Sequence, residues 1–508
     1  MARSARASKL LARASAVHAH VGMALEQTKL QLAERAFKSF GHRLNGLLDK
    51  ATDERIVHFV RRAESIAWLP RHKRQLRQLR ELFESRHPAL GTFHRVLGLH
   101  PNYRRAVITN LLFNAVLFGE RKRKAFERRY HITPPFLMVM SPLMRCNLHC
   151  IGCYAGNYPR EKDPLSLDVL DRTVTEAKQM GMYFFTISGG EPFMRKDLLD
   201  LYERHSDATF LIYTNGTLID DETIARMQAC GNVSPAISVE GFAEETNARR
   251  GSYKGRPVFD IVMETMDRLR EARIMFGFSA TATRLNADVY LRDEFYDLMI
   301  EKGCLYGWFF IFVPVGQHAD VNLMTAPDQR NALREKVLEV RRTRPIFVAD
   351  FWNDGCLTGG CMSGGTTYFH INYRGDLEPC VFMHFATHNI VDLYREGGHL
   401  WDVLETPFFK AIRERNRKDP NPLRPCPIID HNEMLEEAVR LTGARPTHTG
   451  AEDVIGRIKD DIRQWAAEYG VLAERAWESG EYDWAKGGRS PFVEAQAAPE
   501  GEPVSPSV

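Results

Sequence analysis

The 508-residue chain is 44% hydrophobic and 26% charged, which is typical of a soluble globular protein of two or three domains. No apolar run is as long as a membrane-spanning helix, and the basic N-terminus predicts an amphipathic helix rather than a signal peptide. Nine cysteines, an odd and clustered set, argue against a secreted disulfide framework and favour a cytoplasmic protein.

The net charge of +3 conceals an asymmetry along the chain. Residues 1–130 contain 27 Lys and Arg against 10 Asp and Glu, a net +17; by subtraction from 68 and 65, the remainder contains 41 and 55, a net −14. The basic part is therefore expected to face something anionic. A membrane surface, a nucleic acid and the chain's own acidic part are the three candidates.

Residues 1–130 form a basic region that we expect to be helical. Apolar residues recur with heptad-like spacing from Leu25 to Phe40, and a basic stretch over 71–86 has leucines on one face. The apolar segment 106–118 is followed closely by Arg121-Lys122-Arg123-Lys124, the order of an interfacial helix with a polybasic flank. A core helix ending in a solvated basic turn fits the same residues equally well.

Residues 131–345 alternate between strand and helix patterns. The predicted strands are 136–140, 183–187, 209–213, 233–239, 274–282 and 306–313. The predicted helices are 167–180, 196–204, 221–229, 258–272, 289–302 and 327–342. Six β-α units in a row predict an α/β fold with a parallel sheet, as an open partial barrel or a doubly wound sheet.

The C-terminal part has a different organisation. Residues 346–430 are rich in Gly, Cys and His and are expected to form a small loop-dominated domain. Residues 431–485 return to a helical pattern, and residues 486–508 have the composition of a disordered tail.

Three cysteines follow the first predicted strand with the spacing C-x3-C-x2-C: Cys146, Cys150 and Cys153. Thiolates this close can bind three corners of a [4Fe–4S] cluster and leave the fourth iron open to a ligand. Part of a zinc site, which normally takes four ligands, is the alternative.

Unusual loops follow the next strands, at the edge where ligands bind in β-α folds. The glycines of Ser188-Gly189-Gly190-Glu191 let the backbone approach a ligand, and Thr214-Asn215-Gly216 follows the third strand. Ser238-Val239-Glu240 offers a hydroxyl and a carboxylate to ribose hydroxyls, and Arg249 or Arg250 could bind a carboxylate with two hydrogen bonds. Each motif alone also fits a tight turn or a solvated surface pair; their occurrence in order, one per strand, favours a site.

Together these motifs resemble the radical S-adenosylmethionine (radical SAM) superfamily over residues 135–320. The resemblance implies a partial (β/α)6 barrel and an enzyme, an oxidoreductase or transferase, whose open iron chelates S-adenosylmethionine. One electron then cleaves the sulfonium to methionine and a 5′-deoxyadenosyl radical, which abstracts a hydrogen atom from the substrate. One departure is Gly152, where many members have an aromatic residue or His; Tyr154 resembles a large subgroup.

The resemblance also implies residue roles. The cluster ligands would be Cys146, Cys150 and Cys153. The methionine amino group would be held by Gly189, Gly190 and Glu191. The ribose would lie near Asn215, Ser238 and Glu240, and the carboxylate at Arg249 or Arg250.

Four more cysteines, Cys356, Cys361, Cys380 and Cys426, lie in the loop-rich segment and suit a second cluster or a zinc ion. The run Gly375-Asp376-Leu377-Glu378-Pro379-Cys380 is similar to the SPASM and twitch extensions of radical SAM enzymes. Only four cysteines are present, which implies one auxiliary [4Fe–4S] cluster. The Pro-Cys-Pro at Cys426 also fits a structural turn. The histidines at 370, 384 and 388 are interpreted as ordinary loop residues.

The substrate is less constrained. A lipid or lipid-linked molecule at the inner face of the membrane is suggested by the basic region and segment 106–129. A peptide or protein is the alternative, suggested by the auxiliary-cluster resemblance. A nucleic-acid binder or RNA-modifying protein that uses the basic region is the third-ranked hypothesis. A nucleic-acid partner is not expected, because no RNA-binding module is recognisable and aromatic residues are sparse among the basic ones. A non-catalytic electron carrier would not need the glycine-rich and ribose-binding loops. The expected electron donor is a flavodoxin- or ferredoxin-type protein.

Overall fold

The structure is a computed structural model that describes residues 52–66, 70–156, 163–316, 319–416, 420–483 and 485–486. The predicted heptad-like segment from Leu25 to Phe40 and nearly all of the predicted tail lie outside these residues. Residues 51–508 form one compact unit, to which the following description refers.

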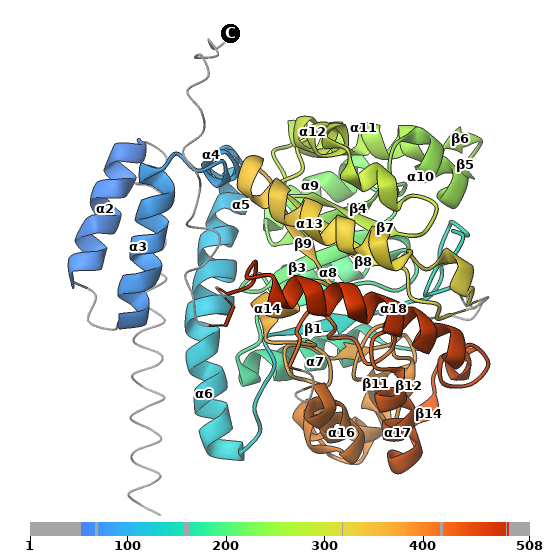
Figure 1. Cartoon of the computed structure of the whole chain (residues 1–508). Helices are drawn as coiled ribbons and strands as arrows, with labels where there is room; N and C mark the ends of the chain where they lie inside the picture. The colour runs from blue at the N-terminus through green and yellow to red at the C-terminus, as the bar shows by residue number, and fades with distance from the viewer. Residues whose placement is uncertain are drawn as a thin grey trace, which may run out of the picture. The chain divides into compact units, whose positions relative to one another are not determined.

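A mostly parallel sheet of ten strands forms the centre of this unit (Figure 1). Six strands match the predicted ones: β1 (Leu137–Met140), β2 (Phe184–Ile187), β3 (Thr209–Thr214), β4 (Val233–Ser238), β7 (Gly277–Ala282) and β8 (Tyr306–Ile311). They pair in the order β1-β2-β3-β4-β7-β8, all parallel, and β9 (Phe347–Asp350) extends the sheet beyond β8. The sheet ends at β9 on this side, so the barrel is partial.

The connecting helices also match the sequence pattern: α7 (Leu167–Met180), α8 (Leu198–Arg204), α9 (Asp221–Cys230), α11 (Val258–Glu271), α12 (Asp293–Glu301) and α13 (Pro327–Thr343). Local sequence sets their ends. Ser166 caps α7 by accepting from Val169 N, and Asp220 caps α9 by accepting from Thr223 N. Gly181 and Gly231 end the same two helices in the left-handed conformation. One helix was not predicted, α10 (Ala243–Arg250), which follows β4.

The segment after residue 350 joins this sheet rather than forming a separate layer. Strand β10 (His370–Ile371) pairs in parallel with β1, and β11 (Asp376–Glu378) and β13 (His388–Asn389) continue the sheet antiparallel. Two short strands, β12 (Phe385–Ala386) and β14 (Arg445–Pro446), pair nearby. The helices of this part are α14 (Gly355–Thr358), α15 (Ile390–Arg395), α16 (Pro407–Asn416), α17 (Asn432–Thr442) and α18 (Lys459–Glu478).

The N-terminal part that is described is helical, as predicted. Its helices are α2 (Asp53–Ile66), α3 (Pro70–Glu84), α4 (Ala89–Leu97), α5 (Pro101–Ala106), the π-helix η1 (Val107–Phe118) and α6 (Gly119–Tyr130). The amides of Asn110 and Asn114 in η1 donate to the carbonyls of Ser206 and Asp207, both at 2.8 Å. These bonds fix η1 against the turn between α8 and β3. Within the described residues, no helix is both long and apolar enough to cross a bilayer.

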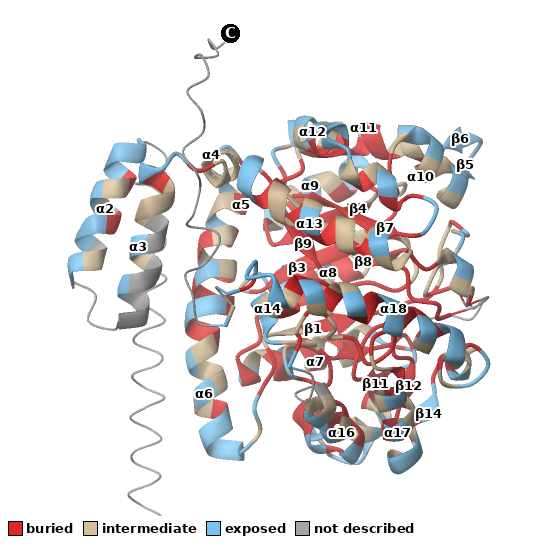
Figure 2. Ribbon diagram, viewed as in Figure 1, coloured by how far each residue is buried: buried red, intermediate tan, exposed pale blue. Residues whose placement is uncertain are grey.

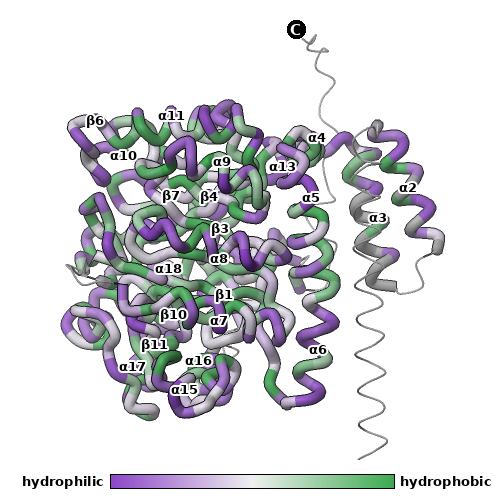
Figure 3. The backbone as a smooth tube through the Cα atoms, turned by 180° about the vertical axis from the view of Figure 1, so that it is seen from behind, coloured by the Kyte–Doolittle hydropathy of each residue, from purple (hydrophilic) through white to green (hydrophobic). Residues whose placement is uncertain are grey.

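The core follows the strands. Almost every residue of β1 to β4 is buried (Figure 2), and the apolar positions gather along the same strands (Figure 3). Strands covered on both faces read as continuous apolar runs, as parallel sheets do. The outer helices are exposed on one face and buried on the other (Figure 2). The buried strands beneath them carry the loops at their carboxyl ends.

Candidate cluster and cofactor site

The three clustered cysteines meet at one cavity of about 220 Å³ inside the partial barrel. Cys146, Cys150 and Cys153 all line it. Six other predicted site residues line the same cavity: Gly189, Gly190, Asn215, Ser238, Arg249 and Arg250. Loops that follow four different strands therefore converge on one space.

The thiols of the cysteine loop are surrounded by N–H donors. The Leu148 N–H donates to Cys146 Sγ at 3.5 Å, and the Asn215 amide approaches the same sulfur at 3.8 Å. The guanidinium of Arg250 lies 3.8 Å from Cys150 Sγ. Donors of this kind stabilise the negative charge that cluster-bound sulfur carries.

The three cysteine side chains line one common space. Among the described residues, no three His, Cys, Asp or Glu side chains are placed as ligands of one metal ion. A [4Fe–4S] cluster binds each thiolate at a different corner, so its ligands need to surround a common space. Burial raises the pKa of Cys146 to about 12 and also raises that of Cys150.

The structure explains why glycine occupies both positions after β2. A Cβ on Gly189 would lie 2.1 Å from the Leu143 carbonyl oxygen, and one on Gly190 would lie 2.0 Å from that of Arg145. The backbone instead bonds to the start of the cysteine loop: Gly190 N donates to Leu143 O at 3.1 Å, and Glu191 N to Arg145 O at 2.9 Å. The glycines thus let two loops touch.

Glu191 lies behind this loop, fully buried and outside the cavity lining. Its carboxylate accepts from Phe193 N at 3.0 Å, Thr214 Oγ1 at 2.7 Å and Asn215 N at 2.7 Å. Burial raises its pKa even against these three donors. In this position Glu191 ties the loop after β2 to the loop after β3.

The loops after β3 and β4 place polar side chains on the cavity. Asn215 donates to Asn147 Oδ1 at 2.9 Å, and its own Oδ1 accepts from Thr217 N at 2.9 Å. Ser238, at the end of β4, lies 3.3 Å from the hydroxyl of Ser279 on β7. Asn215 and Ser238 both line the cavity at the strand ends; their contact with a ribose stays a prediction.

Glu240 is fully buried and forms ion pairs with both arginines of α10. Arg249 contacts Glu240 Oε2 at 2.7 Å, and Arg250 donates its Nε–H to Oε1 at 3.0 Å. Burial favours the neutral acid, but the two guanidinium groups outweigh it and hold the pKa of Glu240 below its usual value. Arg249 also exchanges two hydrogen bonds with Ile151, which anchors the cysteine loop to α10.

Tyr154 and Gly152 lie at the site, although neither was assigned a role in binding the cluster or the cofactor from the sequence. Tyr154, directly after the third cysteine, hydrogen-bonds to Ser188, and both line the cavity. Gly152 has a positive φ of 68°, and a Cβ there would lie 2.7 Å from the Phe312 ring. The sequence departure at Gly152 thus coincides with an aromatic ring supplied by the segment after β8.

Three of the four C-terminal cysteines also meet. Cys361, Cys380 and Cys426 line one small cavity of about 30 Å³, whereas Cys356, on α14, lines two neighbouring ones. Cys380 Sγ lies 2.9 Å from the Tyr368 hydroxyl, and burial raises its pKa to about 12. Cys426, which the sequence left open as a structural turn, belongs to the group; Cys356 stands apart from it.

The nearby histidines make contacts typical of structural residues. His370 is buried and bridges Ser141 Oγ at 2.8 Å and Glu378 Oε2 at 2.6 Å. His384 is buried and stacks on His448 with ring centroids 4.6 Å apart. His388 is exposed on β13. None of the three lines the cavity of either cysteine group.

Comparison with known proteins finds similarity to radical SAM proteins. Residues 140–282 match the profile of the radical SAM superfamily. The chain is 23% identical over 329 residues to an AdoMet-dependent heme synthase of Methanosarcina barkeri, covering 59% of this chain and 90% of that protein. It is 26% identical over 305 residues to the mycofactocin maturase MftC of Mycolicibacterium smegmatis, covering 57% and 74%. Among solved structures, SuiB of Streptococcus suis bound to S-adenosylmethionine aligns with a TM-score of 0.48 and 20% identity, covering 59% of this chain and 73% of that one.

Proposed function

Because the chain belongs to the radical SAM superfamily through its domain at residues 140–282, we propose that it cleaves S-adenosylmethionine reductively and removes a hydrogen atom from a substrate. Held by Cys146, Cys150 and Cys153 and reduced by a flavodoxin- or ferredoxin-type protein, a [4Fe–4S] cluster would supply the one electron needed to cleave the C5′–S bond to methionine and a 5′-deoxyadenosyl radical. The supporting observation is that the three cysteines share one cavity with six further residues predicted to contact the cofactor.

The residues of this chain bind and orient in this reaction. Cys146, Cys150 and Cys153 hold the cluster, and the Arg250 guanidinium beside Cys150 stabilises its negative charge. Arg249 and Arg250 present cationic edges to the methionine carboxylate, while Glu240 fixes their positions from behind. Glu191 acts in the same way on the loop backbone, so we assign it a positioning role rather than direct contact with the amino group.

Asn215 and Ser238 offer an amide and a hydroxyl to the ribose. Their own partners support this role, because Asn147 and Ser279 hold the two side chains at the cavity wall. A ligand that contacts these residues and the arginines spans the carboxyl ends of β3 and β4, next to the cysteine loop.

We also propose that the C-terminal cysteines hold one auxiliary [4Fe–4S] cluster. Cys361, Cys380 and Cys426 around a common cavity support three of its ligands. Cys356 becomes the fourth ligand only if α14 shifts, because it lines different cavities. Zinc in the same place is the alternative.

For the location, we propose a peripheral protein at the inner face of the membrane. Leu112, Val116 and Leu117 of η1 are exposed by 45%, 42% and 38%, and the basic run of α6 follows. That run is partly used inside the protein: Lys122 donates to the Tyr183 hydroxyl at 2.6 Å and Arg123 to the Gly181 carbonyl at 2.8 Å. Flotation with anionic vesicles at low and high salt tests this proposal; no flotation at low salt contradicts it.

Anaerobic reconstitution with iron and sulfide tests the chemistry. We expect about eight irons per chain, and 5′-deoxyadenosine from S-adenosylmethionine with dithionite or a reduced flavodoxin. About four irons per chain together with 5′-deoxyadenosine formation would mean that the C-terminal cysteines bind zinc or have a structural role. Clusters that assemble but give no cleavage with either reductant would count against the enzyme and favour an electron carrier.

A further inference from the structure

The cavity continues from the cysteines into the barrel, and its wall changes character on the way. Alternate residues of each strand face inward. On β1 to β3 these are Leu137, Val139, Phe184, Thr186, Leu211 and Tyr213. On β8 they are Trp308 and Phe310. The wall is therefore polar at the strand ends and apolar along the strands.

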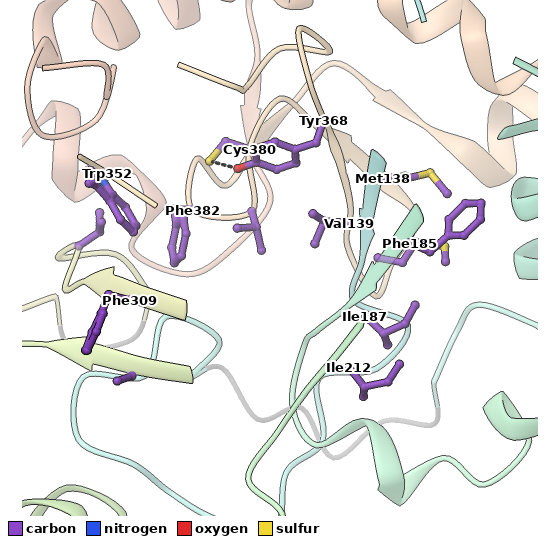
Figure 4. Packing of buried hydrophobic residues seen from close by; sticks show 14 of the residues in the cluster. Met138, Val139, Phe185, Ile187, Ile212, Phe309, Trp352, Tyr368, Cys380 and Phe382 are labelled. Atoms are coloured by element: carbon purple, nitrogen blue, oxygen red, sulfur yellow. Dashed lines mark hydrogen bonds between the residues drawn. The ribbon is translucent and has the colours of Figure 1, made fainter. Parts of the chain in front are cut away.

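The open side of the barrel is covered by apolar residues of the C-terminal part. Phe351, Met362, Tyr368 and Phe382 line this cavity and also the small cavity of the auxiliary cysteines, so they form the partition between the two. Figure 4 shows Tyr368 pointing toward Cys380 and Phe382 beside Trp352. The Phe382 and Trp352 rings are 5.1 Å apart. These four side chains are three aromatic rings and one thioether, with no charged or amide group among them.

The charged side chains that line the cavity lie at one end of it. Among the described residues that line the cavity, Arg249 and Arg250 are the only ones with charged side chains, and Glu240 already pairs with both. Along the strands the polar groups are a few hydroxyls, such as those of Thr186 and Thr281. A peptide segment placed here would bury backbone N–H and C=O groups without enough partners, whereas a hydrocarbon has no such groups to satisfy.

Building on the proposed function, we infer that the part of the substrate that enters this cavity is an acyl chain of a lipid. The C–H bond of a chain methylene breaks, the C5′–H bond of 5′-deoxyadenosine forms, and the unpaired electron passes to the chain carbon. The charged headgroup stays outside, because the described wall offers it no free counter-charge.

Isotope transfer tests the inference on the reconstituted holoenzyme. Vesicles of dipalmitoyl phosphatidylglycerol with perdeuterated acyl chains are mixed with S-adenosylmethionine and dithionite, and the mass of 5′-deoxyadenosine is measured. We expect one deuterium in the product. Deuterium transferred from a perdeuterated peptide mixture and not from the lipid would overturn the inference while keeping the chemistry. If no 5′-deoxyadenosine forms at all, the proposed function itself fails.

Binding gives a second measurement that does not depend on turnover. Fluorescence of cis-parinaric acid, an 18-carbon polyene fatty acid, should report uptake into the cavity, and palmitate should displace it while acetyl-trileucine amide should not. Displacement by the peptide alone would contradict the inference. Phe310→Asp should weaken binding at least tenfold and Phe310→Leu less than threefold. Leu285→Asp, at a residue 78% exposed and outside the cavity lining, is the control and should bind like the parent.

Discussion

The two cysteine groups sit in contrasting surroundings. Cys146, Cys150 and Cys153 are half-buried and line a large cavity. N–H donors from the cysteine loop itself, from the loop after β3 and from α10 approach two of these thiols. Cys380 and Cys426 are buried, and their small cavity is walled by aromatic rings. A centre that must bind and release a small molecule needs space and polar edges, whereas a centre that only carries electrons is served by enclosure. The contrast supports the proposal that the two cysteine groups have different tasks.

The largest effect on activity is expected at the open group, which consists of Cys146, Cys150 and Cys153. Cys146→Ala should remove about four irons and lower 5′-deoxyadenosine formation at least about a hundredfold. Iron analysis and product assay on the reconstituted protein measure both. Cys230→Ala is the matched control, because Cys230 lies at the end of α9 away from both cavities. If the Cys146→Ala variant kept full activity, the open group would not be the catalytic one, and the comparison between the two cysteine groups would fail.

The next effect is expected at the enclosed group, which consists of Cys361, Cys380 and Cys426. Cys426→Ala should lose about four irons, because its thiol lies with those of Cys361 and Cys380. Cys356→Ala should keep the auxiliary cluster, since Cys356 lines other cavities. Iron counts and electron paramagnetic resonance of the reduced proteins distinguish the two. Equal loss in both variants would mean that α14 moves to supply a fourth ligand.

A buried ion pair contacts the backbone of Cys426, one of the three enclosed cysteines. Arg330 and Asp430 are 2.6 Å apart with side chains 0% and 1% exposed, and Asp430 accepts from the Cys426 N–H at 3.0 Å. Arg330→Met leaves Asp430 buried without its cation, so we expect a loss of about 3–5 kcal/mol in the free energy of unfolding. Chemical denaturation measures it. Arg292→Met, in an exposed pair with Glu294, should leave the midpoint unchanged.

The smallest effect is expected at Glu191. Glu191→Gln places an amide N–H₂ against N–H and O–H donors, so the loops after β2 and β3 should loosen at a cost of about 1–3 kcal/mol. We expect roughly tenfold weaker S-adenosylmethionine binding by anaerobic calorimetry. Glu244→Gln on the exposed face of α10 should bind normally. Unchanged affinity at Glu191→Gln would show that the loop is held by its backbone alone.

Much of this arrangement could be predicted from the sequence because it depends on local patterns. Helix 167–180 has the predicted bounds, and the loops that follow the strands converge as the parallel topology requires. Helix α10 was missed because only Thr246 among its eight residues is buried, so it has no apolar periodicity to detect.

Other features depend on contacts that spacing does not encode. Glu191 and Glu240 look like ligand-binding residues in the sequence, yet both carboxylates are turned inward to neighbouring backbone or arginine groups. The separation of Cys356 from the other three cysteines depends on where α14 packs. The apolar wall requires residues of the barrel strands and of the C-terminal part together.

The pairing of β10 with β1 has a consequence for how the protein is made. The two strands meet across some 230 positions of sequence, as the hydrogen bond between Ser141 and His370 shows with a separation of 229. During synthesis the free edge of β1 has no permanent partner until residue 371 has emerged from the ribosome. Closing so long a loop is slow, and an unpaired strand edge can bind other chains. The order of assembly therefore makes the partly synthesised barrel the stage most prone to aggregation, and a chaperone or slow cold expression should raise the yield of folded chain.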